Sequence, residues 1–103
     1  MRGLSEKMTR DDALRVLGEH RAELEQLGVK SLALFGSLVR NEAGPESDVD
    51  LLVEFEGRAT FDRYMELKSL LEEALGRRVD LVTQRALKPR LRPSIEKEAV
   101  RVA

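Results

Sequence analysis

The sequence contains no cysteine, which excludes both a disulfide framework and a thiolate metal site. This absence agrees with a reducing cytoplasm. The first residues lack the apolar stretch of a signal peptide, and no apolar run approaches the ~20 residues that a membrane-spanning helix needs. We therefore expect a soluble, cytoplasmic protein that does not associate with a membrane.

The sequence also lacks an excess of charge of either sign. It has 18 Lys and Arg residues against 19 Asp and Glu residues, and its formal net charge is −1. General attraction to nucleic acid is therefore not indicated, and we expect no nucleic-acid partner. A chain of 103 residues has room for one domain. We expect residues 1–8 to form a flexible tail and residues 9–103 to form that single domain.

The hydrophobic pattern predicts helices alternating with strands. Apolar residues at helical spacing predict one helix from the cap at Thr9 to a stop at Gly28, and a second over residues 61–75 between Thr60 and Gly76. Three short apolar runs are typical of strands: residues 30–35, 48–56 and 77–83. We expect a helical turn at residues 37–41, a loop at 42–47, a short helix capped by Ser94, and an extended piece at 100–102. The order predicts an α/β (α+β) fold, a small mixed β-sheet with helices packed on one face.

Two acidic residues at the start of the second predicted strand are candidate metal ligands. Asp48 and Asp50 are two positions apart, so their side chains point to the same face of a strand. Two adjacent carboxylates repel each other unless a cation neutralises them, and hard oxygen ligands suit magnesium or manganese. Asp80 has the same apolar surroundings in the third predicted strand. If the two strands are neighbours, Asp80 completes a site of three carboxylates.

A glycine and a serine between the first two predicted strands are candidate phosphate ligands. Gly36 allows the backbone to turn sharply after the first strand, and exposed amides at such a turn favour an anion. The Ser37 hydroxyl adds a further donor for a phosphate oxygen. Phosphate contacts beside metal ligands are what nucleotidyl transfer from a metal-bound triphosphate requires.

The spacing of these residues is more specific than the residues themselves. Ten residues separate Ser37 from Asp48, and a match to this whole pattern arises by chance in on the order of one chain per thousand. The stretch from Leu34 to Phe55 resembles the nucleotidyltransferase superfamily that includes DNA polymerase β. It is most similar to the minimal nucleotidyltransferases, whose signature is Gly-Ser, ten residues and Asp-x-Asp. The resemblance extends over about residues 28–82 and implies the nucleotidyltransferase fold.

The resemblance also implies a role for each matching residue. Asp48 and Asp50 would hold two magnesium ions that bridge the triphosphate of ATP, and Asp80 would bind one metal and help to deprotonate the attacking hydroxyl. Gly36 and Ser37 would hold the outgoing phosphates. Many relatives have Arg-Gly-Glu where this chain has Arg40-Asn41-Glu42, and asparagine tolerates the left-handed backbone of that glycine. Arg40 is then either a further phosphate ligand or a solvated side chain.

The resemblance finally implies a partner. Minimal members act as antitoxins of HEPN-domain toxins, and some transfer AMP to a tyrosine of the toxin. A chain of this size has no room for a separate acceptor-binding domain, so we expect the partner, or self-association into a homo-oligomer, to complete the site. One alternative is a catalytically silent antitoxin that acts by docking alone. Another is transfer to a small molecule or, less attractively, to an RNA end.

Other conspicuous side chains are assigned more ordinary roles. We interpret the single histidine, His20, as a packed or partly exposed helix residue rather than a catalytic group. The single tyrosine, Tyr64, is interpreted as a helix packing residue. Six cations gather within sixteen residues: Arg77, Arg78, Arg85, Lys88, Arg90 and Arg92. They form either a solvated edge or a basic rim that attracts phosphates or an acidic partner.

Overall fold

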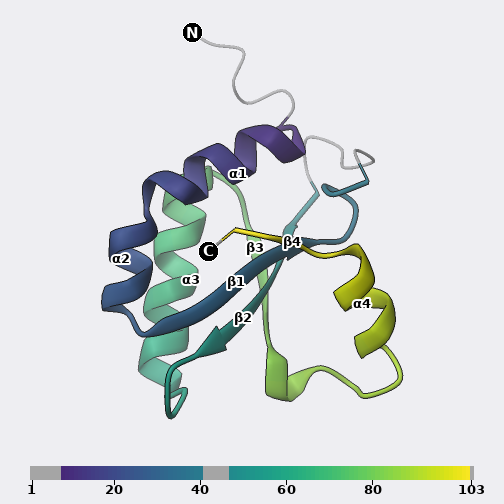
Figure 1. The fold of residues 1–103 in the computed structure, drawn as a ribbon. Helices are drawn as coiled ribbons and strands as arrows, with labels where there is room; N and C mark the ends of the chain where they lie inside the picture. The colour runs from purple at the N-terminus through teal and green to yellow at the C-terminus, as the bar shows by residue number, and fades with distance from the viewer. Residues whose placement is uncertain (1–7, 41–46, 103) are drawn as a thin grey trace, which may run out of the picture.

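Four strands form the centre of the fold in a computed structural model that describes residues 8–40 and 47–102 (Figure 1). The elements are, in order, α1 (Arg10–Glu19), α2 (Arg21–Gln26), β1 (Val29–Phe35), β2 (Val49–Phe55), α3 (Phe61–Leu75), β3 (Val79–Thr83), the 3-10 helix η1 (Gln84–Ala86), α4 (Arg92–Glu98) and β4 (Val100–Arg101). The strand order is β3-β2-β1-β4. Strand β1 is antiparallel to β2 and β4, whereas β2 and β3 are parallel. The predicted mixed sheet in an α+β fold is therefore confirmed.

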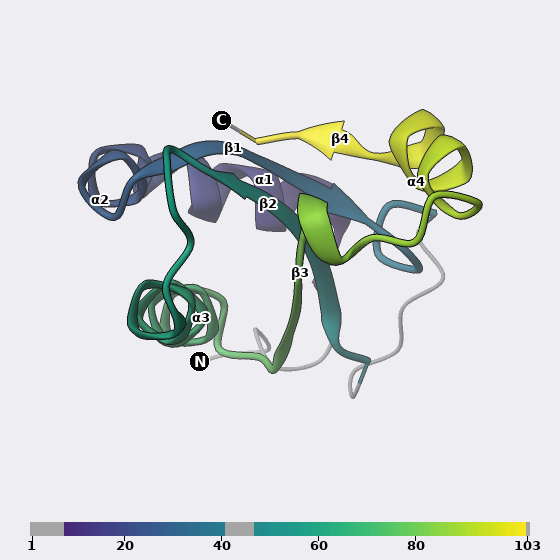
Figure 2. The ribbon, with the colours of Figure 1, turned by 90° about the horizontal axis from the view of Figure 1, so that it is seen from below.

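One hydrophobic core lies between the sheet and the first three helices. Its fully buried leucines come from every layer: Leu17 of α1, Leu24 of α2, Leu67 and Leu71 of α3, Leu32 and Leu34 of β1, and Leu51 of β2. Burying each of these side chains contributes about 1.5–3 kcal/mol. Helix α4 buries no residue and stands apart from α2 and α3 in both views (Figures 1 and 2). Within the described residues, no helix combines the length and the apolar character needed to cross a membrane.

The N-terminal helical region begins as predicted but is broken in the middle. Thr9 caps α1 in a capping box with Asp12, since each residue's side chain accepts the other's backbone N–H at 3.1 Å. The prediction of one helix up to Gly28 is wrong, because the chain leaves helical geometry at His20 (φ −103°, ψ 17°). The break allows α1 to contact α3 while α2 packs against β1. His20 contacts Glu23 at the surface (2.6 Å).

Helix α3 has the predicted ends and ties the core to β3. The Thr60 side chain accepts the Arg63 N–H, and Gly76 ends the helix in a left-handed conformation (φ +66°). The Tyr64 hydroxyl donates to the Leu81 carbonyl oxygen at 2.5 Å. Tyr64 therefore has a structural contact, in agreement with its interpretation as a packing residue.

The C-terminal segment differs from the prediction in its helix start. Helix α4 begins at Arg92 rather than after Ser94, and no side chain caps it, so the predicted Ser94 cap is wrong. Pro93 explains the earlier start, because proline is favoured in the first turn of a helix. The predicted final extended piece is present as β4, which pairs with β1 at the edge of the sheet. The 3-10 helix η1, capped by the Thr83 hydroxyl, had not been anticipated.

Candidate active site

The turn after β1 forms one wall of the candidate site. Gly36 adopts a left-handed conformation (φ +80°), which a residue with a Cβ rarely adopts. Residues 37–40, within the predicted helical turn at 37–41, form a hydrogen-bonded turn, and the Val39 N–H donates to the Gly36 carbonyl at 3.1 Å. The buried side chains of Leu38 and Val39 fix this turn to the core, and Ser37 is half-buried. Asn41 and most of the predicted loop lie outside the described residues.

The start of β2 places its acids beside that turn. Val49 is buried in the core, so Asp48 and Asp50 on either side of it point to the opposite face of the sheet. Phe35 pairs with Asp50 across β1 and β2, which brings the Gly36 backbone against the Asp50 carboxylate. A Cβ on Gly36 would overlap the Asp50 Oδ2 and lie 2.9 Å from its Cγ. Only glycine lets the turn and the carboxylate approach this closely.

Strand β3 adds the third acid. Asp80 is the parallel-register partner of Asp50, and its neighbours Val79 and Leu81 are both buried. Asp80 therefore lies on the same face of the sheet as Asp50, on the adjacent strand. The sequence had left open whether these two strands were neighbours, and the register answers that question.

The electrostatics around Asp50 indicate an excess of negative charge. Burial, followed by the charges of Asp80 and Asp48, raises the pKa of Asp50 to about 6, while Arg40 opposes the rise and Glu98 adds to it. Asp48 is more exposed and lies 3.6 Å from the Arg78 Nε. A divalent cation would relieve the repulsion at Asp50, and an all-oxygen set of carboxylates is the donor chemistry that magnesium prefers. As placed, however, no three His, Cys, Asp or Glu side chains of the described residues form a ready-made metal site.

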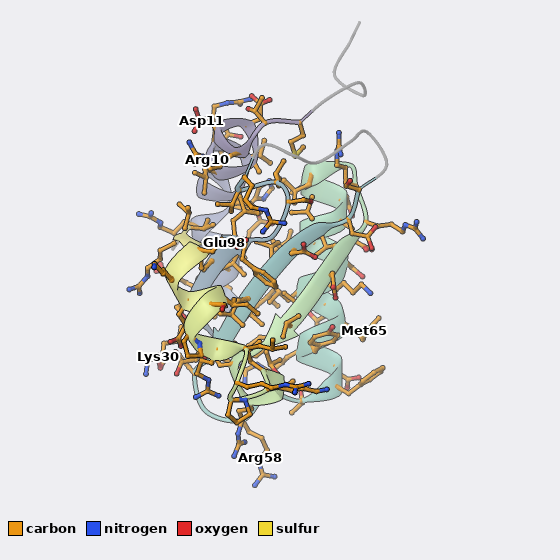
Figure 3. The ribbon with its side chains drawn as sticks, turned by 90° about the vertical axis from the view of Figure 1, so that its right-hand side faces the viewer. Arg10, Asp11, Lys30, Arg58, Met65 and Glu98 are labelled. Carbon is orange, nitrogen blue, oxygen red and sulfur yellow. The ribbon has the colours of Figure 1, made fainter. Side chains whose placement is uncertain are left out.

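Glu98 is a member of this region that the sequence analysis missed. It is the last residue of α4, where Figure 3 shows it beside the sheet. Its Oε1 accepts hydrogen bonds from the Gly36 N–H at 2.7 Å and from the Arg40 Nη1 at 2.8 Å. The same Arg40 atom also donates to Oε2 at 2.9 Å. Glu98 lies 62 residues from Gly36 in sequence, so no local pattern could have revealed the contact.

The structure separates the members of the basic stretch. Arg78 lies next to Asp48 at the edge of the candidate site, whereas the Arg92 guanidinium donates to the Gln84 carbonyl at 3.2 Å. Arg85 in η1 is exposed, as are Lys88 and Arg90 between η1 and α4. Arg78 is therefore a cation of this stretch that contacts a predicted site residue.

Comparison with known proteins shows the family to which this chain belongs. The sequence profile of a family described as "Nucleotidyltransferase domain" matches residues 17–102. The chain belongs to this nucleotidyltransferase family.

Two relatives are similar to this chain over nearly its whole length. The chain is 41% identical over 96 residues to the protein adenylyltransferase MntA of Thermococcus cleftensis, covering 92% of this chain and 97% of the relative. A solved structure described as a candidate minimal nucleotidyltransferase is 38% identical with a TM-score of 0.80, covering 90% of this chain and 95% of the other. The protein is thus a minimal nucleotidyltransferase of the MntA type.

A more distant solved structure shares the fold. It is the complex of a tri-AMPylated Shewanella oneidensis HEPN toxin with an MNT antitoxin. The matched chain is 20% identical with a TM-score of 0.63, and the match covers 87% of this chain and 71% of that one.

Proposed function

We propose that this nucleotidyltransferase transfers AMP from ATP to a tyrosine hydroxyl of a HEPN-domain partner, and that it acts in this way as an antitoxin. The observation that carries the proposal is the juxtaposition of the Gly36 turn with Asp50 and Asp80 on adjacent strands. The name of the Thermococcus cleftensis relative and the AMPylated toxin in the Shewanella oneidensis complex support the reaction and the class of partner.

Each of the predicted site residues has a role in this proposal. Asp48, Asp50 and Asp80 would hold two magnesium ions, with manganese as an alternative, and the ions would neutralise charge on the triphosphate. Gly36, Ser37 and Arg40 would bind the outgoing phosphates. The location of the first three on one face, with Gly36 against Asp50, supports this division into metal ligands and phosphate ligands.

The proposed transfer replaces one phosphorus–oxygen bond with another. The acceptor oxygen forms a bond to the α-phosphorus of ATP, the bond from that phosphorus to the oxygen bridging to the β-phosphate breaks, and pyrophosphate leaves. Asp80 receives the proton of the attacking hydroxyl. A group that receives this proton must lie within reach of the acceptor hydroxyl. Asp80 suits this role because it is exposed at the sheet edge, whereas Asp50 is half-buried.

The test is a transfer assay with a HEPN-domain protein as the acceptor. The two proteins are incubated with magnesium and ATP labelled on its α-phosphate, and the labelled residue is located by mass spectrometry. We expect label on a partner tyrosine, and its loss in Asp48→Asn and Asp50→Asn. Asp11→Asn is the matched control, since Asp11 is an exposed carboxylate on α1, and it should transfer as the wild type does.

The alternatives correspond to different outcomes of the same assay. Tight binding of the partner without any label would contradict catalysis and favour an antitoxin that acts by docking. Label on another residue would contradict the tyrosine acceptor. Label that appears only on an added small molecule or RNA would contradict a protein acceptor altogether.

A further inference from the structure

The carboxylate of Glu98 occupies donors that the proposed function assigns to a phosphate. The Gly36 N–H and Arg40 are two of the proposed phosphate ligands, and both donate to Glu98 at 2.7–2.9 Å. A carboxylate and a phosphate are both oxyanions and accept hydrogen bonds from the same kinds of donor. The Gly36 N–H has one hydrogen, so a phosphate oxygen and Glu98 compete for it.

Charge adds a second reason for competition. Asp48, Asp50 and Asp80 already gather on this face of the sheet, and Glu98 brings a fourth carboxylate within electrostatic range of Asp50. A triphosphate that entered beside all four would meet strong like-charge repulsion. Divalent cations would offset the three aspartates, but Glu98 is bound to the turn itself. Its departure would remove one negative charge from the position that the phosphates need.

The attachment of α4 allows Glu98 to leave. Helix α4 buries no residue, and the following strand β4 pairs with β1 at only two register positions, Val100 with Leu34 and Arg101 with Ala33. The Glu98 side chain is 29% exposed and its Arg40 partner 47% exposed. The side chain can therefore rotate away from the turn without displacing any buried residue of α4.

We propose that Glu98 is a built-in competitor of the nucleotide: it holds the Gly36 amide and Arg40 in the nucleotide-free protein and is displaced by the phosphates of the incoming triphosphate. This inference rests on the proposed function, because it requires that the Gly36 turn binds phosphate. It assigns to the end of α4 control over the affinity for ATP.

The test is equilibrium binding of ATP with magnesium, without an acceptor, to the wild type and to Glu98→Gln. The amide keeps the shape of the side chain but loses its charge, so its bonds to Arg40 weaken. We expect the Kd for ATP to fall roughly three- to tenfold. Inorganic triphosphate should bind more tightly by a similar factor, whereas adenosine, which has no phosphate, should not.

A matched control distinguishes competition by Glu98 for the Gly36 turn from a general effect of removing one negative charge. Glu96→Gln removes the same charge from an exposed position of the same helix, and its Kd for ATP should stay within about twofold of the wild type. Equal tightening in both variants would overturn the proposal. Unchanged or weaker binding in Glu98→Gln would overturn it as well, because a residue that only positions Arg40 would weaken binding when altered.

Two further points keep the result unambiguous. Thermal unfolding shows whether Glu98→Gln is folded, and Glu98→Asp supplies a second variant that keeps the charge but shortens the reach by one methylene. It should also bind ATP more tightly, and binding no tighter than in the wild type would contradict the competition. A wild-type protein that binds no nucleotide would instead refute the proposed function itself.

Discussion

The substitution Gly36→Ala tests the close approach on which the site depends. Alanine at φ +80° costs about 1–2 kcal/mol in backbone strain. Its Cβ would also overlap the Asp50 Oδ2 and approach the Asp50 Cβ to 3.1 Å. The Asp50 side chain must therefore leave its rotamer, which costs about 1 kcal/mol more. We expect a total destabilisation of about 2–3 kcal/mol, equivalent to a Tm lower by roughly 8–24 °C.

The chain offers a control with the same strain and no clash. Gly57 also has a positive φ (+68°), but a Cβ there would meet no atom within 4 Å. Gly57→Ala should therefore show only the backbone cost of about 1–2 kcal/mol. In an Asp50→Ala background, the two substitutions should cost nearly the same, because the Oδ2 and Cγ that clash are gone and only the 3.1 Å contact with the Asp50 Cβ remains.

The rate of AMP transfer should differ more between Gly36→Ala and Gly57→Ala than their stabilities do. Gly36→Ala moves both a proposed phosphate ligand and Asp50, and a misplacement of this kind costs about 100-fold or more in rate. Gly57→Ala should transfer label as the wild type does. Stability is measured by urea and thermal unfolding, and activity by transfer of labelled AMP to the partner. If Gly36→Ala is no worse than Gly57→Ala in both assays, the reasoning is refuted.

Four further predictions concern the charge of Asp50, magnesium binding, the packing of α3 and the loop contacts of Arg63. Because the pKa of Asp50 is raised to about 6 in the folded state, its proton is held more tightly there than in the unfolded chain. As Asp50 ionises, the wild type therefore loses stability that Asp50→Asn keeps. In the presence of a chelator, the difference in free energy of unfolding in favour of Asp50→Asn should grow from about pH 4 to about pH 6 and then level off. A difference that does not change with pH would contradict this. At about pH 7, magnesium should raise the Tm of the wild type more than that of Asp50→Asn. Tyr64→Phe should lower the free energy of unfolding by about 1 kcal/mol in urea titrations, through loss of the bond to the Leu81 carbonyl, and leave AMP transfer unchanged; lost transfer in a folded variant would assign Tyr64 a functional role. Arg63→Met should cost about 2 kcal/mol, because the guanidinium donates to the carbonyls of Leu27, Glu56 and Arg58 and lies over the Phe55 ring; equal unfolding midpoints would show that these contacts contribute nothing.

The sequence alone determined the features that local chemistry encodes. Thr9 and Thr60 mark helix starts because their side chains accept backbone N–H groups one turn later. The two-residue spacing of Asp48 and Asp50 fixed their common face because side chains alternate along a strand. Gly36 marked a sharp turn because it tolerates a positive φ. Each of these signals lies within a few residues of the feature that it predicts.

Other features depended on contacts between distant parts of the chain. The break at His20 follows from how α1 and α2 each pack on separate elements, and helical periodicity continues through it without a sign. The pairing of Asp50 with Asp80 required β3 to lie beside β2, in a register that the packing of the whole core selects. Glu98 contacts the Gly36 turn only because β4 pairs with β1 on the side opposite β2. The sequence thus determined the orientation of the proposed site residues, whereas tertiary packing decided which of their strands are neighbours, because periodicity encodes orientation but not neighbours.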